Sequence, residues 1–489
     1  MNIIAFDLGG SGGKLFLGSY DKGRLSFQLL HRFEHSAIEI KGHLYWNLLQ
    51  IYHELCTGIT KAVNITSDDI CSLGIDSFCN DYALVSHDGE LLSQMHSYRD
   101  KRTLQFRSRL YDIVSPEQLY HINGNQNAPF NTLMQLGAMM LNGQGTFLSG
   151  NKLLFLPDLL IYFLSGKAMT EYTLASVSQM FDYSTQNWSN DILEKYNIPG
   201  SLFASIVMPG TINCCTSGES NQLFHSKGFD ITTVCEHDTA SAFLASVQQK
   251  DCAIISCGTW ALIGTETAAP VITDYGYRYN IANEGGYTGH HRILKNVMGT
   301  WLIQELRADY QTHGQSYTYA EMEQAAFSEN AFQYFIDVDD EIFYTPGDMI
   351  GKITAYCKRH YGSFPDTLGK LVRCVYESLA MKYRWNLEKL HCLTKKTFKT
   401  INILGGGSKS SLMCQFTSNV TGLPVTAGPV EATALGNMIV QLTAQKQISG
   451  IEEGRRLIKD SCETFEYIPQ DIETWSIKYQ KFKNMYNLN

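Results

Sequence analysis

The chain has 489 residues, of which 44% are apolar and 18% are charged. This length favours two or more domains, and the apolar content excludes a disordered chain. Lysine and arginine number 39 against 48 acidic residues, a formal charge of -9. That balance excludes the basic surface that nonspecific nucleic-acid binding requires. We therefore expect small-molecule partners and no nucleic acid.

Cysteine usage and hydropathy predict a cytoplasmic protein without a membrane segment. The thirteen cysteines are scattered and form no C-x-x-C, which is typical of a reducing compartment. The first six residues lack the positive region of a signal peptide. The most apolar window, 153–164, is 12 residues long and contains Pro157 and Asp158. Because it is too short to span a bilayer, it predicts a buried helix.

The chain opens with a predicted strand, a tight turn and a second strand. Residues 3–7 are an apolar run ending in an acid, glycines dominate 9–13, and 15–18 are apolar again. Further strands are expected at 25–33, 72–76 and 82–86, and apolar residues at helical spacing predict a helix over 46–63. The stretch from about 100 to 230 is mostly helical in pattern.

The second half repeats this opening. Residues 252–256 and 260–264 are apolar and flank the turn 257–259. We interpret this as a weak internal duplication with a boundary near 247, which gives domains 1–247 and 248–489. Helix-rich sequence over 292–395 precedes a strand at 401–404, and the tail from 451 is polar and mixed.

The first glycine turn is a candidate phosphate contact. Gly13-Lys14 matches only the end of the P-loop pattern, and the dinucleotide fingerprint is absent. Backbone N–H groups of such a turn can still approach phosphate oxygens, with Lys14 adding a positive charge. An ordinary hairpin is the more frequent use of a glycine cluster alone. Asp7 favours the functional interpretation, because an acid ending a buried strand is costly unless it binds a cation or a donor.

Asp238 precedes a helix-like run and has two interpretations. An aspartate at a helix start is most often an N-cap, and by itself that use is the more frequent. The same carboxylate beside an interdomain cleft could act as a general base on a hydroxyl.

Other turns have less specific patterns. Residues 405–407 and 428–433 could bring backbone to a nucleotide, and 283–286 resembles an exposed polar turn, but ordinary loops contain the same residues. Cys235 with His237, Cys252 with Cys257, and His290 with its neighbour His291 match no zinc spacing. We predict no zinc site there.

Ten motifs in a fixed order are more specific than any one of them. They are Asp7-Leu-Gly-Gly-Ser-Gly-Gly-Lys14, Gly74-Ile-Asp-Ser77, Tyr98-Arg-Asp100, Pro129-Phe-Asn-Thr132, His237-Asp-Thr-Ala-Ser-Ala242, Ser256-Cys-Gly-Thr-Trp260, Asn283-Glu-Gly-Gly286, Leu294-Lys-Asn-Val-Met-Gly299 with Trp301, Gly405-Gly-Gly407, and Ala427-Gly-Pro-Val-Glu-Ala432 with Leu435-Gly-Asn437. In these motifs the chain resembles the FGGY carbohydrate kinases, and most closely their rhamnulokinase subgroup, from residue 3 to about 440.

The resemblance implies an α/β fold of two actin-like (ribonuclease-H-like) domains around a central cleft. The sugar would lie mostly on the N-terminal side and ATP mostly on the C-terminal side. Asp238 would be the general base and Asp7 the acid near Mg²⁺. The remaining implied contacts are Gly10, Ser11, Gly12, Gly13 and Lys14 for the first phosphate loop, Thr259, Gln304 and Gly406 for the nucleotide, and Cys79, His237, Thr239 and Asn296 for the sugar.

The activity that the resemblance implies is ATP-dependent phosphorylation of a ketose, with the O1 hydroxyl of L-rhamnulose as the first expectation. The alternatives are another sugar, such as L-fuculose or a pentulose, and a sugar or nucleotide sensor without turnover. The sequence departs from the family at Lys14, where arginine is usual. It also departs at 77–80, where Ser-Phe-Cys-Asn stands for the usual Thr-Trp-Gly-Val and Cys79 replaces the glycine expected to contact the sugar.

Overall fold

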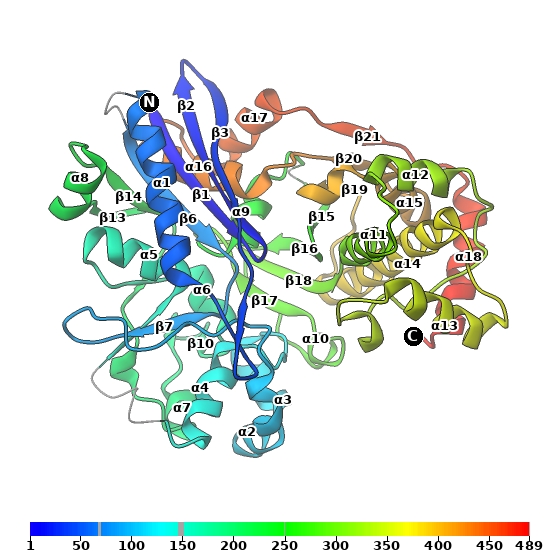
Figure 1. The fold of residues 1–489 in the computed structure, drawn as a ribbon, viewed down its shortest axis with the longest axis horizontal. Helices are drawn as coiled ribbons and strands as arrows, with labels where there is room; N and C mark the ends of the chain where they lie inside the picture. Colours follow the sequence, from blue (N-terminus) through cyan, green and yellow to red (C-terminus); the bar gives the residue numbers. More distant parts are fainter. Residues whose placement is uncertain (67–69, 145–150, 249, 489) are drawn as a thin grey trace. The chain divides into compact units, whose positions relative to one another are not determined.

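The computed structural model describes residues 1–66, 70–144, 151–248 and 250–488. Figure 1 shows the chain, which divides into two compact units. The first contains Met1–Ala245, Glu266–Ile293 and Ala432–Ser461, and the second contains Ser246–Thr265, Leu294–Glu431 and Cys462–Asn489. Each unit is therefore built from segments that are distant in the sequence.

A six-stranded sheet is the core of the first unit, in the order β13-β14-β6-β1-β2-β3. Its strands are β1 (Asn2–Gly9), β2 (Gly12–Asp21), β3 (Arg24–Glu34), β6 (Ile70–Ser77), β13 (Thr211–Cys215) and β14 (Asp230–Thr233). β1 and β2 form an antiparallel hairpin, while β6 runs parallel to β1 and β14 runs parallel to β6. The carboxyl ends of β1, β6 and β14 therefore meet at one edge of the sheet.

Helices cover both faces of this sheet. Helices α1 (Leu48–Thr66) and α5 (Leu156–Ser165) pack on one face, and α9 (Asp238–Leu244) and α16 (Ala432–Ala444) pack on the other. Figure 1 shows α1 beside the strands of the opening hairpin. Helix α1 buries Ile51, Leu55 and Ile59 against them, as apolar residues at helical spacing predict. The expected strands and the expected first helix are confirmed to within a few residues.

The rest of the first unit consists of short helices, short strand pairs and the edge strand β17. The helices are η1 (Lys101–Phe106), α2 (Arg107–Ile113), α3 (Pro116–Asn123), α4 (Thr132–Leu141), α6 (Tyr172–Val177), α7 (Asn190–Lys195), η3 (Gly200–Leu202), α8 (Gly218–Phe224) and α10 (Asp274–Arg278). The strands are β4 (Ile38–Ile40), β5 (His43–Tyr45), β7 (Tyr82–Val85), β8 (Lys152–Phe155), β9 (Thr170–Glu171), β10 (Phe181–Asp182), β11 (Asn187–Trp188), β12 (Ile206–Val207) and β17 (Ala282–Gly285).

The strands β8 to β14 and the start of α5 correct the sequence prediction. The mostly helical pattern of 100–230 also contains β8 to β14, strands of only two to five residues. Such strands are too short to produce a detectable alternation. The predicted helix at 153–164 begins at Leu156, because the preceding residues form β8 and Pro157 favours the first helical turn.

Apart from its edge strand β17, the sheet of the second unit has the order β18-β16-β15-β19-β20-β21. Its strands are β15 (Cys252–Cys257), β16 (Trp260–Thr267), β18 (His291–Met298), β19 (Thr400–Leu404), β20 (Val425–Ala427) and β21 (Phe465–Tyr467). The strands β16 and β18 each have terminal residues in the first unit. As in the first sheet, an antiparallel hairpin is followed by two parallel strands. This shared order supports the predicted internal duplication.

The second unit also contains helices that come between and after the strands of this sheet in the sequence. They are α11 (Trp301–Thr312), α12 (Tyr319–Phe327), η4 (Glu341–Phe343), α13 (Met349–Tyr361), α14 (Leu368–Thr394), η5 (Gly406–Lys409), α15 (Ser411–Thr421) and α18 (Ile472–Met485). The helix α14 packs against α12 and α15. Among the residues that the structure describes, no helix is both long and apolar enough to cross a membrane.

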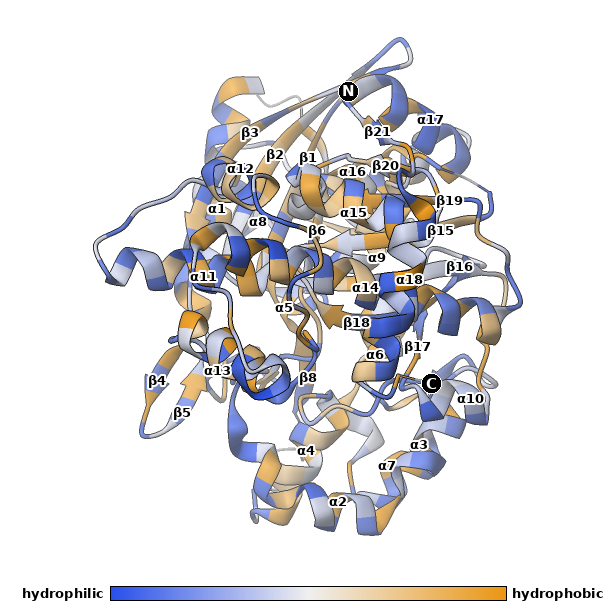
Figure 2. Ribbon diagram, turned by 90° about the vertical axis from the view of Figure 1, so that its right-hand side faces the viewer, coloured by the Kyte–Doolittle hydropathy of each residue, from blue (hydrophilic) through white to orange (hydrophobic). Residues whose placement is uncertain are grey.

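Helix α17 (Ile451–Ser461) completes the first unit beside α16 and β3. Figure 2 shows a largely hydrophilic helix, yet it buries Leu457 and Ile458. Apart from the buried Arg455, its charged residues lie mostly toward solvent and its few apolar residues mostly toward the core, the arrangement of an amphipathic surface helix.

The contact between α9 and α16 depends on a glycine. A Cβ atom at Gly436 would lie 1.8 Å from the backbone oxygen of Ser241, so no side chain fits at the crossing. We expect Gly436→Ala to lower the free energy of unfolding by about 1–3 kcal/mol or more, because the two helices must separate. Thermal unfolding followed by circular dichroism measures the effect.

The control is Gly218→Ala in α8, where a Cβ atom would meet nothing within 4 Å. Alanine is the better helix former, so this variant should keep or slightly raise the melting temperature. Equal melting temperatures for the two variants would contradict the tight crossing.

Candidate active site

The carboxylates of the first unit gather where the parallel strands of its sheet end. Asp7 on β1 is in register with Asp76 on β6 and with Lys14 on β2, so the three side chains share one face. The chain after β14 extends this edge, because Ser77 N–H donates to the Glu236 carbonyl over 2.8 Å. Asp238 follows two residues later as the first residue of α9. Three acids thus lie on the side of the sheet that α9 and α16 cover.

Asp76 is fully buried in this group. Burial raises its pKa well above the usual range, and the nearby Asp7 and Asp238 carboxylates raise it further. Asn437 on α16 donates to Asp76 Oδ2 over 2.6 Å, which opposes the rise. Its other oxygen, Oδ1, has no hydrogen-bond partner among the residues that the structure describes. An additional positive group near these acids would therefore be strongly favoured.

The glycine turn is a hairpin with Gly10 and Ser11 at its tip, since Gly9 pairs with Gly12. Packing requires two of its glycines: a Cβ atom at Gly12 would meet the Phe33 backbone at 2.6 Å, and one at Gly13 would meet the Phe33 ring. The close packing of β3 thus explains these two residues without any ligand. At the tip of the turn, Ser11 is exposed and Gly10 is half-buried. The assignment of Gly10 to Lys14 as a phosphate loop stays a prediction.

Asp238 is not the N-cap of α9. His237 occupies that position, and Asp238 is the first helical residue. Its Oδ1 accepts from the Thr239 N–H over 2.6 Å and from Thr239 Oγ1 over 3.1 Å. Burial raises the pKa of Asp238 to about 6, although these bonds and Arg292 lower it. Its side chain is 28% exposed, so the carboxylate is both accessible and an unusually strong base for an aspartate.

The neighbours of Asp238 are held by hydrogen bonds. Thr239 directs its hydroxyl to Asp238, and His237 lies with Nε2 3.5 Å from Asp238 Oδ1. On its other side, His237 Nδ1 accepts from Arg292 over 3.1 Å. Burial, and then Arg292, lowers the pKa of His237 well below its usual value. His237 is therefore neutral at physiological pH.

Cys79 lies in the turn after β6, close to this group. Burial raises the pKa of its thiol, and Glu284, Asp238 and Asp81 act in the same direction. The following residue, Asn80, has a φ of 75°, a conformation that asparagine tolerates far better than a β-branched residue. This backbone requirement explains asparagine at position 80.

In the second unit, two of the predicted nucleotide residues contact each other. Thr259, in the turn between β15 and β16, donates through Oγ1 to Gln304 Oε1 over 3.5 Å. Gln304 donates to Thr300 Oγ1, which donates in turn to the Gly258 carbonyl. The turn is thus joined to the start of α11, whose side chains order it.

Gly406 is in the same region of the second unit. It begins η5 after β19, which runs parallel to β15 and ends beside it. A Cβ atom at Gly407 would meet Cys257 Sγ at 2.5 Å, whereas one at Gly406 would meet nothing within 4 Å. Two loops therefore stand side by side at adjacent strand ends, with open space at Gly406. Asn296, predicted to contact the sugar, lies on the part of β18 that belongs to this unit.

Sequence reasoning missed three charged residues of this site. Asp76 carries the same signal as Asp7, an acid that ends a buried strand, and could have been found. Glu284 was expected in an exposed polar turn, but it lies in β17 and is 4% exposed. Arg292 is 1% exposed on β18, and nothing in its neighbouring sequence distinguishes it from a surface arginine.

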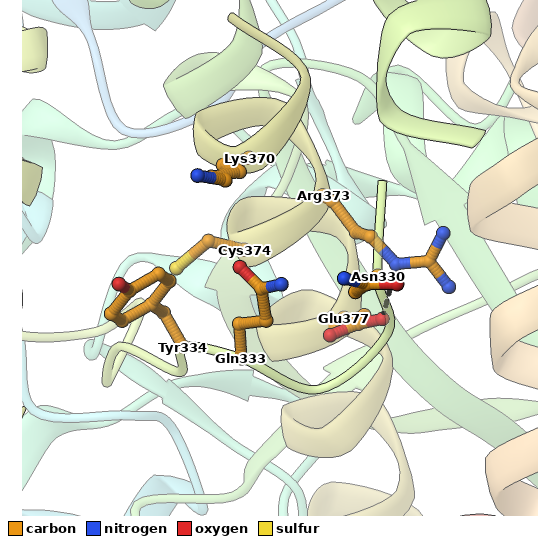
Figure 3. Close-up of a pocket in the computed structure, with 7 residues that line it drawn as sticks. All are labelled: Asn330, Gln333, Tyr334, Lys370, Arg373, Cys374 and Glu377. Atoms are coloured by element: carbon orange, nitrogen blue, oxygen red, sulfur yellow. Dashed lines mark hydrogen bonds and ion pairs between the residues drawn. The ribbon is translucent and has the colours of Figure 1, made fainter. Parts of the chain in front are cut away.

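Two hollows lie outside this site. A hollow in the second unit, lined by Lys370, Arg373 and Glu377 among others, has a volume of about 10 Å³ and holds one water at most (Figure 3). A groove of about 380 Å³ in the first unit contains Trp188 and Phe203. Neither hollow contains a predicted site residue.

The comparison with protein-family models matches nearly the whole chain. The N-terminal domain of the FGGY family of carbohydrate kinases matches residues 2–245, and its C-terminal domain matches 253–445. The chain therefore belongs to the FGGY family of carbohydrate kinases. It is 36% identical over 484 residues to the rhamnulokinase of Bacteroides thetaiotaomicron, covering 99% of both chains. It is 34% identical over 482 residues to that of Bacillus subtilis, covering 98% of this chain and 97% of the relative.

Solved structures share the fold. A ligand-bound xylulose kinase from Lactobacillus acidophilus has a TM-score of 0.83 at 17% identity, covering 99% of this chain and 98% of the other. Plasmodium falciparum glycerol kinase with ADP has a TM-score of 0.80 at 14% identity, covering 99% and 97%. The predicted α/β class with two actin-like domains and the predicted sugar kinase are confirmed.

Behind the Asp238 region, three further carboxyl groups are fully buried. Glu171 Oε2 accepts from the Leu174 and Glu236 N–H groups, and a side-chain hydrogen bond that forms when one of the two groups is protonated joins Glu236 to Asp158. Burial raises the pKa of Glu171 to about 7, and burial together with the neighbouring acids raises the pKa of Asp158 and Glu236. The folded protein therefore holds protons in this cluster that the unfolded chain releases.

This cluster predicts a stability that falls as pH rises. A carboxyl group with a raised folded pKa stabilises the fold below the unfolded pKa, near 4, and loses that contribution as pH rises through the folded pKa, near 7 for Glu171. We expect Glu236→Gln to raise stability at pH 8 by about 1–3 kcal/mol and much less at pH 5. Melting temperatures at the two pH values measure this.

The control is Glu39→Gln, an exposed glutamate on β4, which should show the same small effect at both pH values. An equal gain or loss for Glu236→Gln at pH 5 and pH 8 would mean that Glu236 holds no extra proton.

Proposed function

We propose that this protein is an ATP-dependent ketose kinase that transfers the γ-phosphoryl group to the O1 hydroxyl of L-rhamnulose. Two observations support the proposal. The relatives named rhamnulokinase match along nearly the whole chain. The observation that carries the chemistry is Asp238, an accessible carboxylate with a pKa raised by burial to about 6 beside two further acids.

Asp238 is the proposed general base. A carboxylate whose pKa lies near 6 is deprotonated at neutral pH, yet binds a proton more readily than an ordinary aspartate. It would accept the proton of the sugar hydroxyl as that oxygen attacks phosphorus. The accepted proton also relieves the repulsion among Asp238, Asp76 and Asp7, so the site favours the transfer.

The acids of the sheet edge fit a magnesium ion. Mg²⁺ in kinases is usually held by one or two carboxylates together with substrate phosphates. We assign Asp7 to this ion, and Asp76 Oδ1, buried without a partner, to the same region. When bound, the ion would neutralise charge on the transferred phosphoryl group. Lys14, in register with Asp7, would add a second positive charge.

We assign the nucleotide to turns of both predicted domains, 1–247 and 248–489. The residues proposed to contact ATP are Gly10, Ser11, Gly12, Gly13, Lys14, Thr259, Gln304 and Gly406. Two features support this assignment. Thr259 and Gln304 are joined by a hydrogen bond, and Gly406 adjoins open space where backbone can approach a ligand.

The sugar pocket is proposed to contain Cys79, His237, Thr239 and Asn296. The electrostatic coupling of Cys79 to Asp238 and Glu284 supports its place near the base. A side chain at position 79, where the family usually has glycine, reduces the space for the sugar carbons. We therefore expect weaker discrimination among ketoses than the family pattern implies.

The role of Asp238 predicts the behaviour of Asp238→Asn. Amide and carboxylate have nearly the same shape, so ATP and sugar should still bind, but the amide cannot accept the proton. We expect kcat to fall about 10²- to 10⁴-fold, with KM values changed much less. Initial rates of ADP release with L-rhamnulose measure this.

The matched control is Asp274→Asn, because Asp274 is likewise the first residue of its helix, α10, but is exposed. It should retain the wild-type rate. Turnover of Asp238→Asn within a few-fold of wild type would contradict the general base. A large fall in melting temperature would assign Asp238 a structural role instead.

The sugar assignment predicts a change in selectivity at position 79. Cys79→Gly should raise the ratio of kcat/KM for L-rhamnulose over L-fuculose by about tenfold, the value of roughly one methyl-sized contact. Asn80 is left unchanged, because valine at a φ of 75° would be strained. The ratio is measured by coupled ADP release with each sugar.

Cys79→Ala shortens the side chain without adding the backbone freedom of glycine, so it separates these two effects. The control is Cys71→Ala, at an exposed cysteine on β6. An unchanged ratio in both Cys79 variants would show that position 79 does not contact the sugar.

A further inference from the structure

Arg292 is a fully buried cation that the proposed reaction does not use directly. It is 1% exposed on β18, where its Nε donates to the Gly285 carbonyl over 2.8 Å. One of its terminal nitrogens, Nη2, lies 2.9 Å from Glu284 Oε2 and 3.1 Å from His237 Nδ1. A single guanidinium thus joins strand β17 to the residue that precedes Asp238.

This contact determines which nitrogen of His237 carries hydrogen. A guanidinium has only donors and is always charged. His237 Nδ1 must therefore accept, and since Arg292 and burial keep the ring neutral, its single hydrogen is on Nε2. In the other tautomer, two N–H groups would face each other in a buried site.

The Nε2 hydrogen lies on the side of Asp238. His237 Nε2 is 3.5 Å from Asp238 Oδ1, the oxygen that already accepts two bonds from Thr239. Donors therefore gather on Oδ1, whereas no residue that the structure describes offers Oδ2 such a set. The two oxygens of the base become unequal, and Oδ2 is the better proton acceptor.

The charged groups around the ring come from three elements. Arg292 on β18, Glu284 on β17 and Asp238 on α9 approach its side chain. Thr173 on α6 accepts from its backbone N–H over 3.1 Å. Arg292 Nη2 contacts both Glu284 and His237. If Arg292 and Glu284 served only to join β17 and β18, the contact with His237 would not be needed.

We propose that Arg292, held by Glu284, is a positioning residue that fixes His237 in its Nε2–H tautomer and so orients Asp238 for proton transfer. The inference rests on the proposed function for its catalytic consequence, but the tautomer itself can be measured without turnover. Two experiments therefore distinguish its failure from the failure of the proposed function.

The first experiment is ¹⁵N NMR of protein labelled at histidine, with the His237 signals assigned by their loss in His237→Gln. Wild-type His237 should show a protonated Nε2 and an unprotonated Nδ1 from pH 6 to 8. The variant Arg292→Met/Glu284→Leu removes the donor without leaving a buried charge unpaired. In it we expect a mixture of tautomers, and protonation of the ring as pH approaches 6.

The second experiment is a double-mutant cycle on kcat. Arg292→Met/Glu284→Leu should lower kcat roughly 10- to 100-fold, the usual range for a group that orients a catalytic residue. Arg292→Lys keeps the charge and one donor and should recover most of the rate. Glutamine can present an amide donor in place of Nε2–H and has no tautomers. In the His237→Gln background the same double substitution should therefore cost less than about threefold.

Each outcome decides the proposal. A cationic or Nδ1–H ring in the wild type overturns it, and so do fully additive losses in the cycle, which would indicate a structural ion pair. If the double variant does not fold, the tautomer of wild-type His237 still tests the proposal, since it must be Nε2–H. Full activity of Asp238→Asn would instead overturn the proposed function and leave the tautomer result standing.

Discussion

The free-energy cost of burying carboxylates at one edge of the first sheet is the constraint on which the arrangement of the surrounding residues depends. Asp7, Asp76 and Asp238 meet where β1, β6 and α9 come together, and burial raises the pKa of the latter two. Such a group is stable only with compensating donors, protons or cations. Asn437 supplies one donor to Asp76, and Thr239 supplies two to Asp238. We propose that the remaining deficit makes this edge suitable for holding a metal ion and for accepting a proton.

Much of the surrounding architecture maintains this edge. Gly436 allows α16 to approach the α9 backbone, which brings Asn437 to Asp76. Behind α9, Glu171 accepts from the Glu236 N–H and so fixes the chain just before His237. Arg292 fixes the other side of His237. The second sheet repeats the strand order of the first, and its adjacent loops at 257–259 and 405–407 are the corresponding strand ends.

The sequence predicted the elements whose signals are local. The opening hairpin, α1, the restart at β15 and the glycine-ended β19 all follow from apolar patterns and turn residues. The short strands between 152 and 233 were missed, because two to five residues give no period. Arg292 and Glu284 were missed for a different reason. Both side chains are buried because Arg292 contacts Glu284 and His237, which are distant from one another in the sequence. No local sequence pattern indicates such a contact. Asp76 was visible as an acid at a strand end but was not weighed.

We propose that Asp238 and the acids beside it support phosphoryl transfer from ATP to a ketose. Its most direct test is the rate of ADP release by the wild-type protein with Mg²⁺ and ATP, measured with L-rhamnulose, L-fuculose and a pentulose in turn and without any sugar. We expect ADP release that requires a ketose, with the highest kcat/KM for L-rhamnulose. ADP release no faster with any ketose than without one would contradict it and favour a sensor.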